Sequence, residues 1–229
     1  MNEYLKMLSD QKLTLIMSLP RNDPDLCLAA FEAGADVVKV HINVDHRASG
    51  THFGRLAEER NALEKMLQNR KGPMGLVLGG SLEAVSLDAL EASDLPFSFH
   101  SVYAHHLPAW AASGKAALMA ACDHTYSLDL VSAMADAGAD VIEASIIPGG
   151  EYGMPLSFLD LAKYRSVVRA AGLPVVVPTQ RAIRPDEAGQ LIRCGVKGLM
   201  IGAVVTGKSA ETIASSIRAF RKAIDDAGR

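Results

Sequence analysis

Residues 33–41 read Ala-Gly-Ala-Asp-Val-Val-Lys-Val-His, and residues 137–145 repeat the stretch as Ala-Gly-Ala-Asp-Val-Ile-Glu-Ala-Ser. A third, more divergent copy runs from Cys194-Gly195 to Leu199. In each copy a helix ends at a small residue, a glycine follows, and a short apolar strand begins. A helix-to-strand motif that recurs along one chain is typical of a protein built from repeated strand–helix units.

The rest of the chain continues this rhythm without a break in composition. The predicted strands are residues 13–19, 37–43, 75–78, 97–103, 117–123, 141–147, 175–178 and 198–201. The predicted helices are residues 25–33, 53–69, 81–92, 107–112, 128–137, 157–171, 185–194 and 210–227. Eight alternating units predict a closed α/β barrel, the (β/α)8 or TIM barrel, as a single domain over residues 1–229. An open doubly wound sheet is the alternative.

Composition excludes several classes of partner. The net charge is −3 and no basic stripe occurs, so we expect no nucleic acid. No apolar run reaches the ~18 residues that span a bilayer, and the first residues do not resemble a signal peptide, so we expect no membrane association. Three dispersed cysteines without a CxxC pair indicate reduced thiols, and hence a cytoplasmic protein. The sequence leaves open whether the chain forms a homo-oligomer.

The strand at residues 37–43 alternates between two faces. Its apolar side chains alternate strictly with the polar side chains of Lys39, His41 and Asn43. If the polar face lay under the helices, it would bury a lysine ammonium at a cost of several kcal/mol unless that ammonium were paired. We therefore expect these three side chains inside the barrel.

The same argument applies to three other strands. It predicts that the side chains of Glu143 and His100 point into the barrel. It also predicts that Asp123 points inward at the very end of its strand. We predict Lys39, Glu143, Asp123 and His41 as the catalytic residues, with Asn43 and His100 as substrate-binding residues. Carboxylates beside a lysine are suited to proton transfer. A structural Lys39–Glu143 ion pair is the alternative.

A phosphate site is predicted where the last strands end. Gly202 closes the final strand, and the short turn that starts at Ala203 presents free N–H groups to an anion. The loop at residues 179–185 supplies Arg181, whose guanidinium can bind phosphate. The glycine-rich loop after the sixth strand adds Gly149 and Gly150.

These last motifs resemble the ribulose-phosphate-binding barrel superfamily. That superfamily includes pentulose-phosphate 3-epimerases, N-acylmannosamine-6-phosphate epimerases, and related sugar-phosphate aldolases and decarboxylases. The likeness lies in Ile147-Pro148-Gly149-Gly150, in residues 156–165 and in residues 195–204. The resemblance implies a barrel with phosphate-binding positions at Gly149, Gly150, Gly202 and Ala203.

The chain departs from each subfamily. The pentulose-phosphate epimerases, which use a metal, carry an Asp on the seventh strand and His and Asp metal ligands on the second and third strands. Here the seventh and third strands end Val177-Pro178-Thr179 and Leu78-Gly79-Gly80. The lysine that N-acylmannosamine-6-phosphate epimerases carry on the third strand is also missing, so the subfamily is not assigned.

No metal or cofactor is predicted. Several potential ligands cluster in sequence, but their spacing is irregular and no HExxH, HxH or cysteine pair occurs. These residues are His41, Asp45, His46, His52, Asp123 and His124.

Three functions remain. The favoured one is an enzyme that acts on a small phosphorylated sugar or related metabolite, an epimerase or isomerase that transfers a proton next to a carbonyl. The second is an aldolase-type lyase in which Lys39 forms a Schiff base, which requires a neutral amine. The third is a non-catalytic protein that binds a phosphorylated metabolite.

Overall fold

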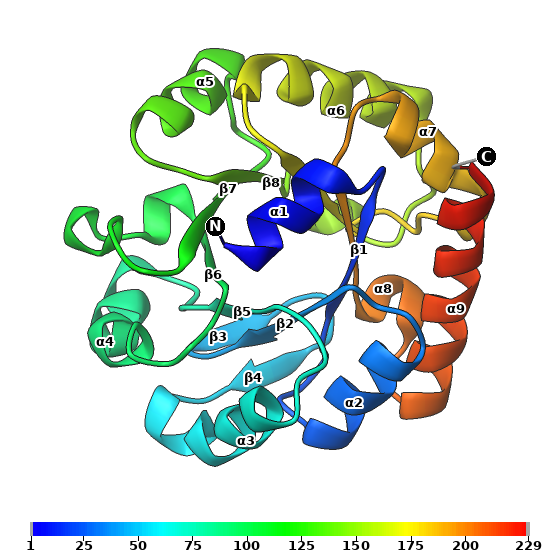
Figure 1. Cartoon of the computed structure of the whole chain (residues 1–229). Coiled ribbons are helices and arrows are strands. Elements are labelled where there is room, and N and C mark those ends of the chain that lie inside the picture. The colour runs from blue at the N-terminus through cyan, green and yellow to red at the C-terminus, as the bar shows by residue number, and fades with distance from the viewer. Residues whose placement is uncertain (1, 228–229) are drawn as a thin grey trace.

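Eight parallel strands close into a barrel in the computed structural model, which describes residues 2–227. Around the ring the order is β1-β10-β9-β8-β7-β6-β5-β2, and helices surround it (Figure 1). The barrel strands are β1 (Thr14–Ser18), β2 (Val37–His41), β5 (Met74–Val77), β6 (Phe99–Tyr103), β7 (Ala117–Cys122), β8 (Val141–Ala144), β9 (Val175–Pro178) and β10 (Gly198–Ile201). The predicted TIM barrel is therefore confirmed.

Most predicted helices are present, with ends that differ by a few residues. The helices are α2 (Pro24–Glu32), α3 (Leu56–Gln68), α4 (Leu82–Ala92), α5 (Leu128–Asp136), α6 (Phe158–Ala171), α7 (Ala188–Arg193) and α9 (Ala210–Ala227). The helix predicted at residues 107–112 is wrong, because that segment forms only a 3-10 turn, η2 (Ala109–Ala111). A similar turn, η4 (Pro185–Glu187), precedes α7.

The repeated motif builds the same junction twice. Gly34 and Gly138 have φ angles of 106° and 105°, a left-handed conformation in which glycine ends the helix without strain. The aspartate that follows accepts a hydrogen bond from the backbone of the preceding strand. Asp36 accepts from the Leu15 N–H at 2.7 Å, and Asp140 accepts from the Leu118 N–H at 2.8 Å.

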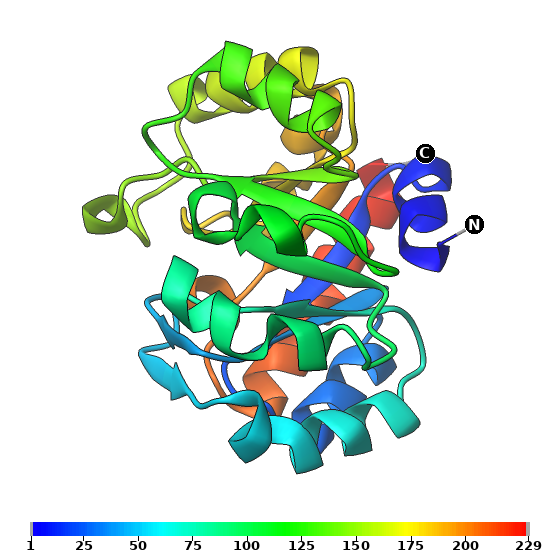
Figure 2. The ribbon, with the colours of Figure 1, turned by 90° about the vertical axis from the view of Figure 1, so that its left-hand side faces the viewer.

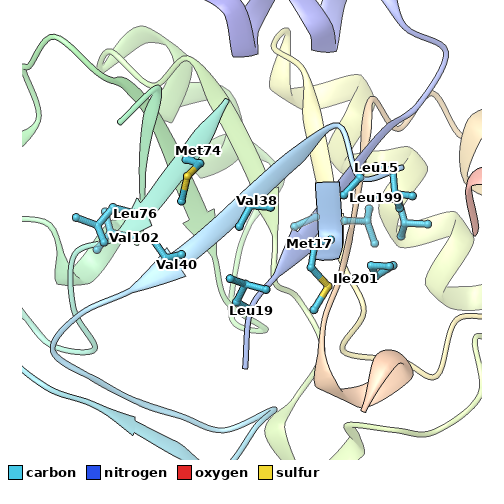
Figure 3. Packing of buried hydrophobic residues seen from close by; sticks show 14 of the residues in the cluster. Leu15, Met17, Leu19, Val38, Val40, Met74, Leu76, Val102, Leu199 and Ile201 are labelled. Carbon is cyan, nitrogen blue, oxygen red and sulfur yellow. The ribbon is translucent and has the colours of Figure 1, made fainter. Parts of the chain in front are cut away.

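Two apolar layers hold the barrel together. The larger layer lies between the strands and the outer helices, and Figure 3 shows part of it around Val38, Val40 and Leu76. The smaller layer fills the interior at the N-terminal end of the strands. There the ring of Tyr4 stacks on Phe99, with their centroids 4.1 Å apart.

An unpredicted helix seals that end of the barrel. Helix α1 (Glu3–Asp10) lies across the ring of strands in Figure 1, and it buries Tyr4 and Leu8 completely. Full burial of such side chains contributes about 1.5–3 kcal/mol each. The open end of the barrel is therefore the one where the strands have their C-termini.

Five short elements lie at the open end. They are β3 (Val44–His46), which pairs antiparallel with β4 (Thr51–Phe53), the 3-10 turns η1 (Ala104–His106) and η3 (Gly149–Glu151), and the single helical turn α8 (Ala203–Thr206). Figure 2 shows the β3–β4 hairpin and the η3 segment on its left-hand side, opposite α1. The hairpin was not predicted, since residue 53 was assigned to a helix.

Candidate active site

A cavity of about 440 Å³ opens at the C-terminal ends of the strands. Six of the predicted site residues line it, and these are Lys39, His41, Asp123, Glu143, Gly149 and Gly202. Their strands are spread around the barrel, so only ring closure brings these side chains together. In barrels of this type the reaction chemistry belongs to this end of the strands.

A buried ion pair crosses the barrel inside the cavity. Lys39 comes from β2 and Glu143 from β8, which stand opposite each other in the ring. Lys39 Nζ donates to Glu143 Oε2 at 3.3 Å, and both side chains are 7% exposed. The pair places a cation and a carboxylate side by side, within reach of a ligand in the cavity.

Two hydroxyl groups fix the carboxylate of Glu143. Ser101 Oγ donates to Oε2 at 2.9 Å, and Ser145 Oγ donates to Oε1 at 2.8 Å. Hydrogen bonds from two hydroxyl groups hold the orientation of a carboxylate. The carboxyl group of Glu143 is therefore held in a fixed orientation beside the cavity, where it can face a bound ligand.

His41 is a buried, neutral imidazole beside this pair. Its Nε2 lies 3.4 Å from Ser18 Oγ, and its Nδ1 has no hydrogen-bond partner within residues 2–227. Burial, the neighbouring His46 ring and the Lys39 ammonium lower the pKa of His41 well below its ordinary value. A neutral imidazole can donate or accept a hydrogen bond, so His41 is available to a ligand oxygen.

Asp123 lies nearer to the rim of the cavity, and its side chain is 30% exposed. Its Oδ1 accepts hydrogen bonds from the Thr125 N–H at 2.8 Å and from Thr125 Oγ1 at 2.7 Å. The bond from the Thr125 hydroxyl lowers the pKa of Asp123, which is therefore ionised at neutral pH. His105 Nδ1 lies 3.8 Å from its other oxygen.

The predicted phosphate positions divide into two groups. Gly149 and Gly202 line the cavity, whereas Gly150 and Ala203 lie just outside its lining. The N–H of Gly202 already donates to Thr179 Oγ1 at 3.0 Å. A ligand oxygen at this position would therefore have to share Gly202 with the threonine hydroxyl or bind the next N–H groups of the turn.

Two predicted site residues point elsewhere. His100 pairs in register with Leu76 and Leu118, and it alternates with Ser101, whose hydroxyl reaches Glu143. The inward prediction for His100 is therefore wrong: its ring lies on the helix side, where burial lowers its pKa to about 4. Asn43 is also absent from the cavity lining.

The side chain of Asn43 has a structural partner instead. Its Nδ2 donates to Asp88 Oδ2 at 2.9 Å, and its backbone has a φ of 54°. Asn43 therefore ends β2 and turns the chain into the hairpin, and the substrate-binding role predicted for it is not supported by its position.

The guanidinium of Arg181 forms ion pairs with two carboxylates. Its Nε lies 3.0 Å from Asp160 Oδ2, and its Nη2 lies 2.6 Å from Glu151 Oε2. The guanidinium is 8% exposed and does not line the cavity. Its position does not support the predicted role as a phosphate ligand, because its guanidinium is paired with Glu151 and with Asp160, which is 1% exposed.

Several lining residues were not predicted from the sequence. Ser101 and Ser145 were given no functional role because single serines in strands carry no motif. Other polar side chains of the lining that are absent from the predicted site include His46, Arg47, Tyr103, His105, His106 and Tyr152. One signal was present: a run of polar residues, Asp45-His46-Arg47, begins four positions after the end of β2.

The histidines and acids around the cavity do not gather into a metal centre. Within residues 2–227, no three His, Cys, Asp or Glu side chains converge in a way that could hold a metal ion.

In the same part of the chain, no helix is both long and apolar enough to cross a bilayer.

Comparisons with known proteins bear on the fold. No protein-family model matches the sequence, and no curated protein matches it. Tryptophan synthase from Mycobacterium tuberculosis is similar with a TM-score of 0.72 and 14% identity, over 96% of each chain.

Two further solved structures are similar. Thiamine phosphate pyrophosphorylase from Pyrococcus furiosus has a TM-score of 0.64 and 16% identity, over 95% of this chain and 98% of that one. KGPDC from Streptococcus mutans has a TM-score of 0.69 and 14% identity, over 94% of this chain and 99% of that one. At 14–16% identity, these similarities show that the chain shares the barrel fold of these proteins.

Proposed function

We propose that this chain is an enzyme that acts on a small phosphorylated sugar or related metabolite and transfers a proton at a carbon next to a carbonyl. The observation that carries the proposal is the Lys39–Glu143 pair, 3.3 Å apart inside a cavity at the C-terminal end of a barrel. One structural neighbour is named a thiamine phosphate pyrophosphorylase. That name refers to a phosphorylated compound, which supports the proposal.

The chemistry follows from the positions of the charges. Glu143 takes the proton from the carbon, and the electron pair of the broken C–H bond moves toward the carbonyl oxygen. Lys39 stabilises the negative charge that develops on this oxygen. Protonation of the opposite face of the carbon by a water molecule gives an epimer. Return of the proton from Glu143 to the neighbouring carbon, with the proton of the adjacent hydroxyl passing to the former carbonyl oxygen, gives an isomer.

The remaining polar groups have supporting roles in this proposal. His41 donates a hydrogen bond to a ligand hydroxyl or carbonyl oxygen. Asp123, at the rim, orients a hydroxyl group of the sugar. The phosphate lies toward Gly149 and Gly202, which line the cavity and have no side chain of their own.

The ion pair favours this mechanism over Schiff-base chemistry. A Schiff-base lysine attacks a carbonyl as the neutral amine. Glu143 stabilises the charged ammonium instead, because the carboxylate is held against Lys39 by two serine hydroxyls. A passive binding protein has no need for a base and a cation so placed.

The direct experiment is solvent exchange. Candidate aldose and ketose phosphates are incubated with the protein in deuterium oxide, and deuterium at carbon is measured by mass spectrometry. We expect incorporation with the wild type and its loss in Glu143→Gln, whereas the surface variant Glu32→Gln retains it. Full exchange in both Glu143→Gln and Asp123→Asn would show that proton transfer at this cluster is wrong.

A further inference from the structure

We propose that Arg47, on the turn of the β3–β4 hairpin, binds an anionic group of the ligand at the mouth of the cavity. The guanidinium lies against Gly149, on the far side of the opening. The inference rests on the proposed function, since it assigns a specific partner to the phosphate of that ligand.

The hairpin brings Arg47 across the barrel. Strands β3 and β4 follow β2, whereas Gly149 follows β8, which stands opposite β2 in the ring. Figure 2 shows both segments extending from the end of the barrel that α1 does not cover. The contact between Arg47 and Gly149 therefore spans the mouth, above the Lys39–Glu143 pair, which spans the same diameter inside.

Several contacts fix the hairpin in place. Phe53 is 1% exposed, and its ring packs against His41 with centroids 4.6 Å apart. The His46 ring lies 4.5 Å from the His41 ring, and its Nδ1 bonds to Ser49 Oγ at 2.8 Å. Arg47 is thus carried by a hairpin whose base is anchored to the wall of the cavity.

Arg47 is the cation available to a ligand. Two Lys or Arg side chains line the cavity, and Lys39 is paired with Glu143. In the described part of the chain, Arg47 has no carboxylate within ion-pair distance. The nearest acid in sequence, Asp45, is held by His52 at 2.7 Å.

Gly149 leaves the space that the guanidinium occupies. A Cβ atom at this position would overlap Nη1 and Cζ of Arg47. The φ of Gly149 is not in the left-handed region, so close approach is the reason for glycine here. An arginine fork beside open backbone can bind two oxygens of a phosphate group at once.

The test uses inorganic phosphate as the probe, titrated calorimetrically against the intact protein. Arg47→Ala is expected to weaken binding at least about fivefold, because a charge-assisted contact is lost at a partly solvated site. Arg60→Ala is the matched control, since Arg60 is bound to Glu64 and Glu91 on the outer surface. Arg47 is exposed, so its replacement leaves the core intact.

A second variant tests the juxtaposition itself. Gly149→Ala is expected to displace the guanidinium and weaken phosphate binding, and the double variant Arg47→Ala/Gly149→Ala is expected to bind no more weakly than Arg47→Ala alone. Additive losses would overturn the claim that Gly149 acts by making room for Arg47.

The failures of the two proposals are distinguishable. Wild-type binding that Arg47→Ala leaves unchanged, or no binding of phosphate at millimolar concentration, overturns the role of Arg47. Neither result touches the proton transfer assigned to Lys39 and Glu143, which deuterium exchange tests separately.

Discussion

Glu143→Gln should destabilise the fold through the lysine that it leaves behind. The substitution keeps the size and shape of the side chain but removes its charge. Ser101 and Ser145 can still bond to the amide group, because an amide both donates and accepts. Lys39, whose side chain is 7% exposed, is left without a counter-ion.

The expected loss follows from burial. Removing one partner of a buried ion pair costs ~3–5 kcal/mol, since the remaining charge is desolvated. Here the pair borders a cavity that water can enter, so we expect the lower end, about 3 kcal/mol. For a chain of this size each kcal/mol shifts Tm by roughly 2–4 °C, which predicts a decrease of about 6–12 °C.

The assay is urea denaturation followed by circular dichroism, applied to Glu143→Gln, Lys39→Met and the double variant. Removing both charges leaves nothing unpaired, so the double variant should be more stable than the sum of the single losses predicts, by about 1–3 kcal/mol. The control is Glu32→Gln, which breaks a surface pair with Lys71 whose side chains are 56% and 54% exposed. It should change stability little.

Additive losses, within about 0.5 kcal/mol, would refute the reasoning. They would mean that Lys39 and Glu143 are each solvated independently and that the pair contributes no coupling.

Further predictions follow from the same contacts. Arg181→Met should cost roughly 3–5 kcal/mol in urea denaturation, because it strands the buried carboxylate of Asp160; phosphate affinity should change less than stability does, and a selective loss of phosphate binding would restore Arg181 to the ligand site. Burial lowers the pKa of His100 to about 4, so the folded state resists its protonation. Stability that is present above about pH 6.5 should therefore fall as the pH drops toward 4, by up to about tenfold per pH unit in the unfolding equilibrium for one histidine, and His100→Gln should flatten that slope. Borohydride with keto-sugar phosphates should trap no adduct on Lys39; added mass in the intact protein would move the assignment to an aldolase-type lyase. Gly75→Ala should cost about 1–3 kcal/mol or more, because a methyl group there overlaps the Phe99 ring inside the barrel; an unchanged midpoint of thermal unfolding would count against this tight contact.

Local signals in the sequence correctly predicted where strands begin and which way β2 faces. The glycine and aspartate of the repeat act within a few residues, at helix ends and strand starts, and the structure shows both at work in Gly34 and Asp36. The alternation in β2 placed Lys39 and His41 inside the barrel for a similar reason, since a strand has only two faces.

The predicted direction of a side chain was wrong where both faces of a strand carry polar and apolar residues. Around His100 the sequence reads Phe-Ser-Phe-His-Ser-Val-Tyr, and polar and apolar residues occur on either face. What selects the inward face is Tyr4, whose ring stacks on Phe99 from a helix that had not been predicted. A partner far away along the chain decides the direction, and no local pattern contains it.

The charged residues show the same division between what local sequence predicts and what the tertiary structure decides. The sequence by itself determined the barrel, its strands and the presence of a polar interior, because periodicity and capping act over short distances. Only the tertiary structure decided which cation is free to bind a ligand. Arg181 and Arg47 are both loop arginines in the sequence, yet one is neutralised by Asp160 and the other faces the cavity. The physical reason is that an ion pair depends on where two loops meet in space, and closure of the barrel brings together segments that the chain keeps far apart.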